Sequence, residues 1–301
     1  SCSRPPPSTR PRAGRTAAVF DIDDAALDRG RADVAARLRL LADAGLLDEE
    51  PPVVAARIGW HTDAATAARD AELVQECAPE RADLKREVLA RFAAVAPSDA
   101  VLASSTSAIA PSVLAEGLAP DVAARVVVGH PGNPPYLLPV IEVVPAPVTA
   151  SGTVDRAAAI YRSVGLRPVV LRREIEGFVF NRLQGALLRE AYCLVRDGIV
   201  DAADVDEVVR SGLGRRWSII GPFETSDLNV RGGIAAHAER MGESYARMGA
   251  ERGQHDPWTP ELVARVAAER RAALPLEDWD ARVRWRDARL MALTPLWEAA
   301  G

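Results

Sequence analysis

The chain has 301 residues, of which 48% are hydrophobic and 26% are charged, and its formal net charge is −5. This length accommodates two domains, and this hydrophobic content is typical of a globular protein. The negative charge argues against a nucleic-acid-binding protein. No apolar run reaches the length of a membrane span, and no hydrophobic signal-peptide core is visible. We therefore expect a small-molecule partner, and neither nucleic acid nor a membrane.

Cysteine and lysine are both rare in this chain. Cys2, Cys77 and Cys193 form an odd, widely spaced set without a metal-ligand pattern, which predicts no metal site and favours a cytoplasmic location. Arginine outnumbers lysine 36 to 1, and the one lysine is Lys85. Either this lysine is present by chance, or its position requires a compact ammonium rather than a planar guanidinium.

The first 173 residues are expected to contain a disordered segment followed by an alternating pattern. Residues 1–16 are rich in proline, carry four arginines and no acid, and are expected to be disordered. From residue 17 onward, apolar β-branched runs alternate with helical patterns. The predicted strands are 17–22, 53–60, 72–77 and four more beginning near 101, 125, 140 and 168, and the predicted helices are 25–46, 64–69, 81–95 and 154–164. This alternation predicts a mostly parallel sheet covered on both faces, in an α/β domain over residues 17–173.

Strand signals stop after residue 173. Apolar residues recur every three or four positions between Phe180 and Val195, which predicts one face of a long helix. Asp201 is placed to cap a second helix that ends near Gly212 and Gly214, and Thr259-Pro260 is placed to open another. Residues 174–301 are therefore expected to form an all-helical domain.

Two segments end apolar runs in polar groups suited to catalysis, Val101-Leu-Ala-Ser-Ser-Thr-Ser107 and Val126-Val-Val-Gly-His130-Pro-Gly-Asn-Pro-Pro135. Ligands of open α/β sheets bind beyond the carboxyl ends of the strands, so both segments deliver their polar groups to one crevice. Glu142 follows His130 by twelve residues, inside an apolar run where a structural strand rarely places a carboxylate. A histidine can remove the proton of an alcohol, and a carboxylate beside it fixes its tautomer. The alternative is a histidine that only packs in the core.

These residues, continued by Glu176-Gly-Phe-Val-Phe-Asn181-Arg182, resemble the 3-hydroxyacyl-CoA dehydrogenase family, and within it the lambda-crystallin/L-gulonate 3-dehydrogenase branch. The shared pattern is Ser-Ser-Thr-Ser, then His-Pro-x-Asn-Pro-Pro with a Glu twelve residues after the His, then Gly-Phe-x-x-Asn-Arg. The similarity extends from about residue 18 to the C-terminus and includes the segments 221–229 and 285–293.

The resemblance implies an oxidoreductase of the kind used in fatty acid metabolism. It would oxidise the 3-hydroxyl of an L-3-hydroxy acid or of a 3-hydroxyacyl-CoA, with His130 as general base and Glu142 as the partner that orients it. The resemblance also implies that Ser107 and Asn181 contact oxygen atoms of the substrate, although a serine commonly ends a strand and an asparagine commonly caps a helix. In the family the helical domain closes the cleft and makes a homodimer. The Gly-His-Pro-Gly-Asn-Pro-Pro segment favours free acids of the gulonate type.

Hydride transfer requires a nicotinamide cofactor, because protein side chains cannot accept a hydride. Asp21 ends the first strand, where an acid binds the adenosine ribose and favours NAD over NADP. The resemblance implies that Glu80 and Lys85 flank the nicotinamide ribose, with Ser107 on the same side. The alternative for Lys85 is a solvated helix face.

One part of the Rossmann pattern is absent from the sequence. The family places a strand, a Gly-x-Gly-x-x-Gly turn and a helix directly before the strand at 17–22, and the sequence has no such unit. Three explanations are open: an incorrect start or reading frame, a degenerate relative that binds NAD weakly, or a partner that supplies the unit. The absent strand is central in the expected order 3-2-1-4-5-6, so we expect a sheet split in two and poor NAD affinity.

Two other functions compete with the dehydrogenase. Asp21-Ile-Asp23 after an apolar strand resembles the nucleophile motif of haloacid dehalogenase-like phosphatases, but Asp24-Ala25 follows where those enzymes have Gly-Thr. The second alternative is a degenerate or structural, crystallin-like homologue with impaired NAD binding. The presence of Ser107, His130, Glu142 and Asn181 together favours catalysis.

Overall fold

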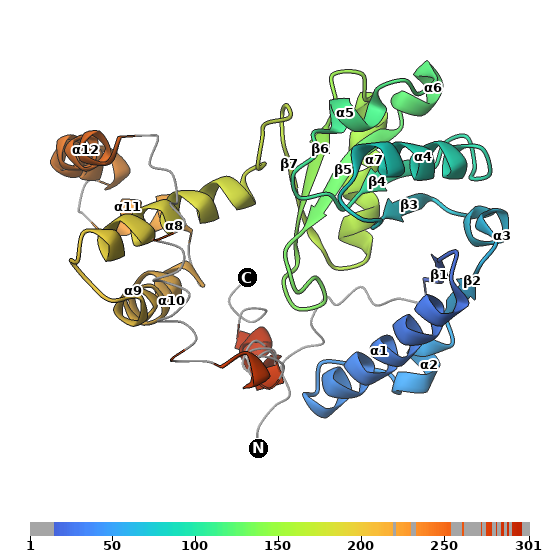
Figure 1. The fold of residues 1–301 in the computed structure, drawn as a ribbon, viewed down its shortest axis with the longest axis horizontal. Coiled ribbons are helices and arrows are strands. Elements are labelled where there is room, and N and C mark those ends of the chain that lie inside the picture. Colours follow the sequence, from blue (N-terminus) through green and yellow to red (C-terminus); the bar gives the residue numbers. More distant parts are fainter. Residues whose placement is uncertain are drawn as a thin grey trace. The chain divides into compact units, whose positions relative to one another are not determined.

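The computed structural model describes residues 15–218, 221–229 and 233–253, together with residues 261, 272, 275–278, 281, 284, 285, 288 and 291–296. Most of the N-terminal segment that we expected to be disordered, and the helix expected to open at Thr259, lie outside the described residues. The chain divides into two compact units, residues 1–182 with 290–292 and residues 183–289 with 293–301 (Figure 1).

A five-stranded sheet forms the centre of the first unit. Its strands, in spatial order, are β3 (Leu73–Glu76), β4 (Val101–Ser104), β5 (Val126–Pro131), β6 (Val140–Pro145) and β7 (Arg167–Val170). Neighbouring strands are parallel except β5 and β6, which are antiparallel. The predicted mostly parallel α/β sheet followed by a helical domain is confirmed.

Helices cover both faces of this sheet (Figure 1). On one face, strand residues such as Leu102 and Val128 pack against α3 (Ala64–Ala68), α4 (Ala82–Ala93) and α5 (Pro111–Ala115). On the other face, Val127 and Val143 pack against Tyr161 of α7 (Ser151–Ser163). A short helix, α6 (Pro120–Ala123), precedes β5. Successive strand residues enter opposite cores, as the two-residue period of a strand requires.

A second, two-stranded sheet holds the beginning of the described chain. It consists of β1 (Ala17–Phe20) and β2 (Ile58–His61), which are parallel, with α1 (Asp24–Asp43) and α2 (Pro51–Ala55) between them in sequence. The expected split of the sheet is therefore present: in the described part of the chain, β1 pairs with β2, β3 pairs with β4, and no ladder joins β1 to β3. Among the described residues, β1 and β3 therefore each have one edge without a neighbouring strand.

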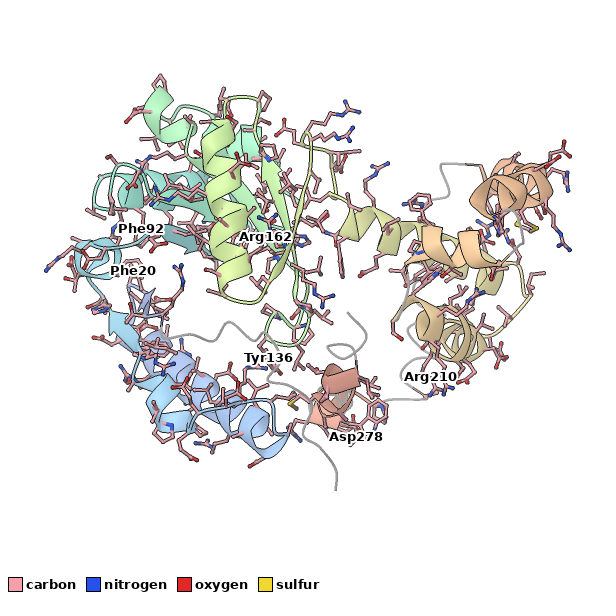
Figure 2. All side chains as sticks on the ribbon, turned by 180° about the vertical axis from the view of Figure 1, so that it is seen from behind. Phe20, Phe92, Tyr136, Arg162, Arg210 and Asp278 are labelled. Atoms are coloured by element: carbon pink, nitrogen blue, oxygen red, sulfur yellow. The ribbon has the colours of Figure 1, made fainter. Side chains whose placement is uncertain are left out.

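Side-chain packing connects β1 to the larger sheet. The rings of Phe20 and Phe92 meet edge to face with their centroids 5.3 Å apart, and Figure 2 shows both side chains. The loop after β5 returns to α1, where Arg37 donates a 2.9 Å hydrogen bond to the hydroxyl of Tyr136, also labelled in Figure 2. Leu41 and Leu137 pack in the same cluster. The first unit is thus held together by side chains where the ladder is interrupted.

The strand predicted at 53–60 is wrong in its first half. Residues 51–55 form α2, and β2 begins at Ile58. Pro51 and Pro52 occupy the first two helical positions, where a proline lacks only an N–H that the helix leaves unpaired in any case. The proline pair therefore starts a helix, although the apolar residues at 53–60 favour a strand in the sequence.

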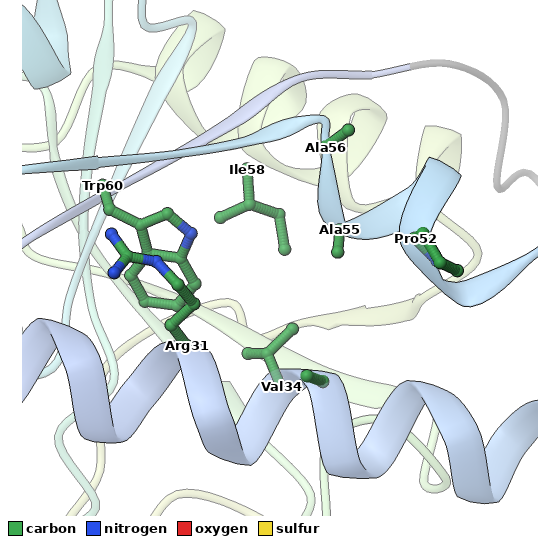
Figure 3. A pocket seen from close by; sticks show the side chains of 8 residues that line it. Arg31, Val34, Pro52, Ala55, Ala56, Ile58 and Trp60 are labelled. Atoms are coloured by element: carbon green, nitrogen blue, oxygen red, sulfur yellow. The ribbon is translucent and has the colours of Figure 1, made fainter.

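A cavity of about 330 Å³ opens between α1, α2 and β2. Figure 3 shows its walls, in which the Arg31 guanidinium lies over the Trp60 ring at 5.4 Å. The other lining residues are small or aliphatic: Val34, Ala35, Pro52, Ala55, Ala56 and Ile58. None of the candidate catalytic or cofactor residues lines this cavity.

The second unit is helical throughout its described part. Its helices are α8 (Phe180–Arg196, which begins in the first unit), α9 (Ala202–Val208), α10 (Gly214–Trp217), α11 (Pro222–Leu228) and α12 (Gly233–Arg252), with a short 3₁₀ helix at Leu276–Asp278. Arg252 of α12 donates to Glu190 at 3.0 Å and also to Asp197. No helix in the described part of the chain is long and apolar enough to span a membrane.

The helix expected to end near Gly212 and Gly214 continues instead. A π-helical turn at Val209–Leu213 joins α9 directly to α10. A Cβ at Gly214 would lie 2.9 Å from the carbonyl oxygen of Val209, which accepts the Gly214 N–H. Gly214 thus permits the wide turn rather than ending the helix. Asp201 occupies the N-cap position of α9 without a side-chain capping bond.

Candidate active site

His130 and Glu142 form a buried pair in the larger sheet. They are directly opposite each other in the antiparallel register of β5 and β6, and are 5% and 3% exposed. His130 Nδ1 lies 2.9 Å from Glu142 Oε2. A carboxylate can only accept, so Nδ1 carries a proton, and in the neutral ring Nε2 then has the lone pair. The predicted orientation of the histidine by Glu142 is present in the geometry.

The second oxygen of Glu142 is held by the start of α8. Glu142 Oε1 accepts the backbone N–H groups of Val179 at 2.8 Å and Phe180 at 3.0 Å. Burial works to raise the pKa of Glu142, but the hydrogen bonds from His130, Phe180 and Val179 outweigh it and hold the pKa below its ordinary value. Glu142 therefore remains an anion beside the imidazole.

Phe178 adopts a backbone conformation that is rare for a side chain of its size. Its φ angle is +50°, and it follows Gly177 at +74°. This turn directs the next two N–H groups to Glu142, while the buried Phe178 ring packs 5.4 Å from the His130 ring at 53°. Strained residues of this kind persist where the surroundings over-determine them, often at functional sites.

Ser107 and Asn181 complete this group. Ser107 Oγ lies 3.1 Å from His130 Nε2, and Asn181 Nδ2 donates to the Ser107 carbonyl at 3.1 Å. Ser107 follows β4 and Asn181 lies in the first turn of α8, so three strands and one helix deliver the four residues. The structure brings together all four side chains that the sequence proposes for catalysis.

Glu80 and Lys85 lie beside this group in a second polar network. Glu80 Oε1 accepts the backbone N–H groups of Ser107 and Ala108, both at 3.1 Å, and the Thr106 hydroxyl. Lys85 Nζ lies 3.4 Å from the other Glu80 oxygen. Burial works to raise the pKa of Glu80, but Thr106, Ala108 and Lys85 together hold it below its ordinary value. Lys85 is 1% exposed, which excludes the solvated helix face considered for it.

Asp21 lies at the end of the smaller sheet, apart from the other candidates. It directly follows β1, its N–H donates to the His61 carbonyl at 3.3 Å, and its side chain accepts the Asp23 N–H at 3.0 Å. Asp23 in turn accepts the Ala25 N–H and caps α1. Asp21 and Glu80 each follow the carboxyl end of a strand, which is the edge of an α/β sheet where ligands bind. A Gly-x-Gly-x-x-Gly turn for the pyrophosphate is not part of the sequence.

Two residues of this region have roles that the sequence did not reveal. Glu76 is 3% exposed and accepts hydrogen bonds from Lys85 and Ser104. Thr106 is 1% exposed and joins the loop after β4 to Glu80. The position of Glu76 could have revealed its role in the sequence: it is a carboxylate at the end of an apolar run, nine residues before the chain's one lysine. Such a carboxylate needs a buried cationic partner.

This arrangement can carry out proton transfer at a hydroxyl group. The imidazole presents Nε2 next to a serine hydroxyl, and a buried carboxylate stabilises the imidazolium that forms when a proton is accepted. An α/β sheet with a buried histidine–carboxylate pair beside a serine hydroxyl fits the class of nicotinamide-dependent dehydrogenases, in which an alcohol loses a proton to the protein and a hydride to the cofactor.

Comparison with known proteins identifies the family. Residues 10–175 match the NAD binding domain of 3-hydroxyacyl-CoA dehydrogenase, and residues 177–273 match its C-terminal domain. The chain belongs to the 3-hydroxyacyl-CoA dehydrogenase family, and NAD is the cofactor of its N-terminal domain. The resemblance seen in the sequence motifs is confirmed.

Relatives and solved structures cover most of the chain. A lambda-crystallin homolog of Bos taurus is 37% identical over 288 residues, which are 94% of this chain and 89% of the relative. An L-carnitine dehydrogenase of a Pseudomonas species is 42% identical over 206 residues, 67% of this chain and 61% of the relative. The crystal structure of an NAD+-dependent 5-formyl-3-hydroxy-2-methylpyridine 4-carboxylic acid 5-dehydrogenase superposes with a TM-score of 0.79 at 28% identity, covering 96% of this chain and 92% of that one.

Proposed function

We propose that the protein oxidises the 3-hydroxyl of an L-3-hydroxy acid, or of its CoA thioester, to a ketone with NAD as the hydride acceptor. The observation that carries this proposal is the continuous contact from Ser107 through the His130 ring to Glu142, with distances of 3.1 Å and 2.9 Å. The family assignment gives the class of reaction, and this geometry supports His130 as the base.

The chain's own residues manage the proton and the orientation of the substrate. The hydroxyl of the substrate would lie beside Nε2 of His130 and within reach of Ser107 Oγ, which lies 3.1 Å from that nitrogen. His130 takes the hydroxyl proton on Nε2 while its Nδ1–H stays bound to Glu142, so the charge formed on the ring lies beside a carboxylate. Ser107 and Asn181 would bind oxygen atoms of the substrate. NAD supplies the acceptor for the hydride that leaves the carbon.

On the cofactor side, we propose that Asp21 binds the adenosine ribose and that Glu80 binds the nicotinamide ribose. An acid at Asp21 would also repel the additional phosphate of NADP. Lys85 would act on this end of the nucleotide through Glu80, because its ammonium contacts protein oxygens.

A free hydroxy acid is the substrate class that we favour over a CoA thioester. Among the relatives is an L-carnitine dehydrogenase, and L-carnitine is a hydroxy acid that carries no CoA. The Gly132-Asn133-Pro134-Pro135 segment after His130 also fits the branch that acts on free acids. The second candidate is a structural, crystallin-like function, because several relatives are named lambda-crystallin or lambda-crystallin homolog.

The test is the formation of NADH, followed at 340 nm, with the purified 301-residue chain and millimolar NAD. The substrates are L-gulonate, L-carnitine, L-3-hydroxybutyrate and L-3-hydroxybutyryl-CoA, with D-3-hydroxybutyrate as the stereochemical control. We expect turnover with an L-hydroxy acid that is lost in His130→Ala. A chain that binds NAD but turns over none of these compounds supports the structural candidate.

A further inference from the structure

Glu76 and Lys85 form a buried ion pair that the proton transfer does not use. Glu76 ends β3, Lys85 lies on α4, and their exposed fractions are 3% and 1%. Lys85 Nζ lies 3.1 Å from each carboxylate oxygen of Glu76 and donates to the Ala78 carbonyl at 2.8 Å. A charge this deeply buried is costly without a partner, so the two residues depend on each other.

This ion pair is connected to the loop that carries Ser107. Glu76 Oε2 accepts the Ser104 hydroxyl, and the Glu76 carbonyl accepts the Ser105 N–H at 2.8 Å. Ser104 Oγ lies 3.3 Å from the Thr106 N–H as its acceptor. The first half of the loop is thereby fixed to the end of β3.

The second half of the loop is fixed through Glu80. Its Oε1 accepts the N–H groups of Ser107 and Ala108, while its Oε2 lies 3.4 Å from Lys85 Nζ. Lys85 thus stands between two carboxylates, one for each half of the loop. The ammonium has oxygens from Glu76, Glu80 and Ala78 around it, which leaves little capacity for a direct nucleotide contact.

We propose that Glu76 and Lys85 are positioning residues that hold the segment 104–108 so that the Ser107 hydroxyl faces His130 Nε2. The catalytic consequence rests on the proposed function of Ser107, whereas the fixed loop is a property of the free protein. The single lysine is explained by this role: a compact ammonium fits between two carboxylates and a carbonyl, and a planar guanidinium does not match that arrangement.

The test is amide hydrogen exchange of the free, full chain, followed by mass spectrometry on peptides that cover residues 104–109. We expect the Ser107 and Ala108 amides to exchange about tenfold faster or more in Glu76→Gln and in Lys85→Met. The double variant should add little to the larger single effect, because both residues act as one pair. Arg125→Met is the matched control: Arg125 is also buried and donates to the Pro97 and Ala100 carbonyls, away from this loop.

Ser104→Ala provides a milder variant if the loss of a buried charge prevents folding. It removes the connection between Glu76 and the loop and leaves the ion pair in place. Unchanged exchange at 107 and 108 in folded Ser104→Ala and Glu76→Gln would overturn the proposal, as would equal acceleration in Arg125→Met.

A kinetic measurement separates this proposal from the proposed function. In an active enzyme, Glu76→Gln should lower kcat at least about tenfold while KM for the hydroxy acid changes less than about twofold, as expected for a lost orientation. Faster exchange without dehydrogenase activity in the parent chain would keep the positioning role and refute the function. If the parent chain is active and its variants show normal exchange, the dehydrogenase function stands and the positioning role is refuted.

Discussion

His130 and Glu142 face each other across β5 and β6, the antiparallel pair within an otherwise parallel five-stranded sheet. Residues in direct register on neighbouring strands project to the same face at a separation that the ladder fixes. The distance between the base and the carboxylate therefore depends on backbone hydrogen bonds rather than on a mobile loop. This pairing also explains the twelve-residue spacing, since the chain leaves β5 and returns along β6.

Removal of the imidazole gives the first prediction. His130→Ala should lower turnover about 10²- to 10⁴-fold with a modest change in KM, because a general base acts in the transition state. The measurement is steady-state NADH formation at saturating NAD. His237→Ala, which removes a histidine of α12, is the matched control and should retain the parent turnover. Comparable losses in both variants would count against His130 as the base.

The second prediction concerns pH and stability. The pKa of Glu142 is lower in the folded chain than its ordinary value, so the unfolded chain binds more protons between these two values. The stabilisation from Glu142 is complete above about pH 5 and is lost as the pH falls through the folded pKa. We expect the free energy of unfolding, measured with urea between pH 7 and pH 3.5, to fall more steeply with decreasing pH in the parent than in Glu142→Gln. Glu116→Gln, at a side chain 72% exposed, should keep the parent's slope.

The third prediction uses the positive φ angle of Phe178. Both Phe178→Ala and Phe178→Gly remove a buried ring and should destabilise the chain by about 3–5 kcal/mol. Glycine adopts φ = +50° without strain, so the glycine variant should be more stable than the alanine variant by about 1 kcal/mol. At Phe92, within α4, the alanine variant should be more stable than the glycine variant by about 1 kcal/mol, because glycine is a poor helix former. Urea midpoints of the four variants provide the comparison, and the same order at both positions would contradict it.

The fourth prediction concerns cofactor affinity. The 301 residues contain no Gly-x-Gly-x-x-Gly turn, and β1 and β3 are not joined, so NAD should bind with a Kd well above the micromolar range. Isothermal titration calorimetry measures this directly. A fusion that adds the first strand, glycine turn and helix of a lambda-crystallin relative before residue 17 should bind at least about tenfold more tightly. The same fusion with its glycines replaced by alanine is the control, and a micromolar Kd for the unmodified chain would disprove the expectation.

Much of the fold follows from local patterns in the sequence. Apolar runs near residues 101, 126 and 140 are long enough and sufficiently β-branched to predict strands, and the polar residues that end them predict the site. His130, Glu142, Ser107 and Asn181 could be selected because each follows or interrupts such a run. The split between β1 and β3 is also expected, because the sequence shows no Gly-x-Gly-x-x-Gly unit before residue 17.

Other features depend on contacts that a sequence does not display. The apolar run at 53–60 gives no sign that Pro51 and Pro52 begin a helix, and Gly214 is indistinguishable in sequence from a helix-ending glycine. The backbone of Phe178 is determined by its surroundings rather than by its own preference. Glu76 acquires its role from Lys85 and Ser104, which come close only when α4 and β4 pack beside β3.

The burial of Lys85 shields the chain's one lysine amine from reagents as long as the chain is folded. Apart from the terminal amine, this side chain offers the sequence's one target for a succinimidyl ester, and it is 1% exposed. A second adduct on an intact molecule therefore records the moment when α4 separates from β3. Labelling followed by intact mass thus reports the opening of this core from a single atom, in a chain whose other 36 Lys and Arg side chains are all arginines.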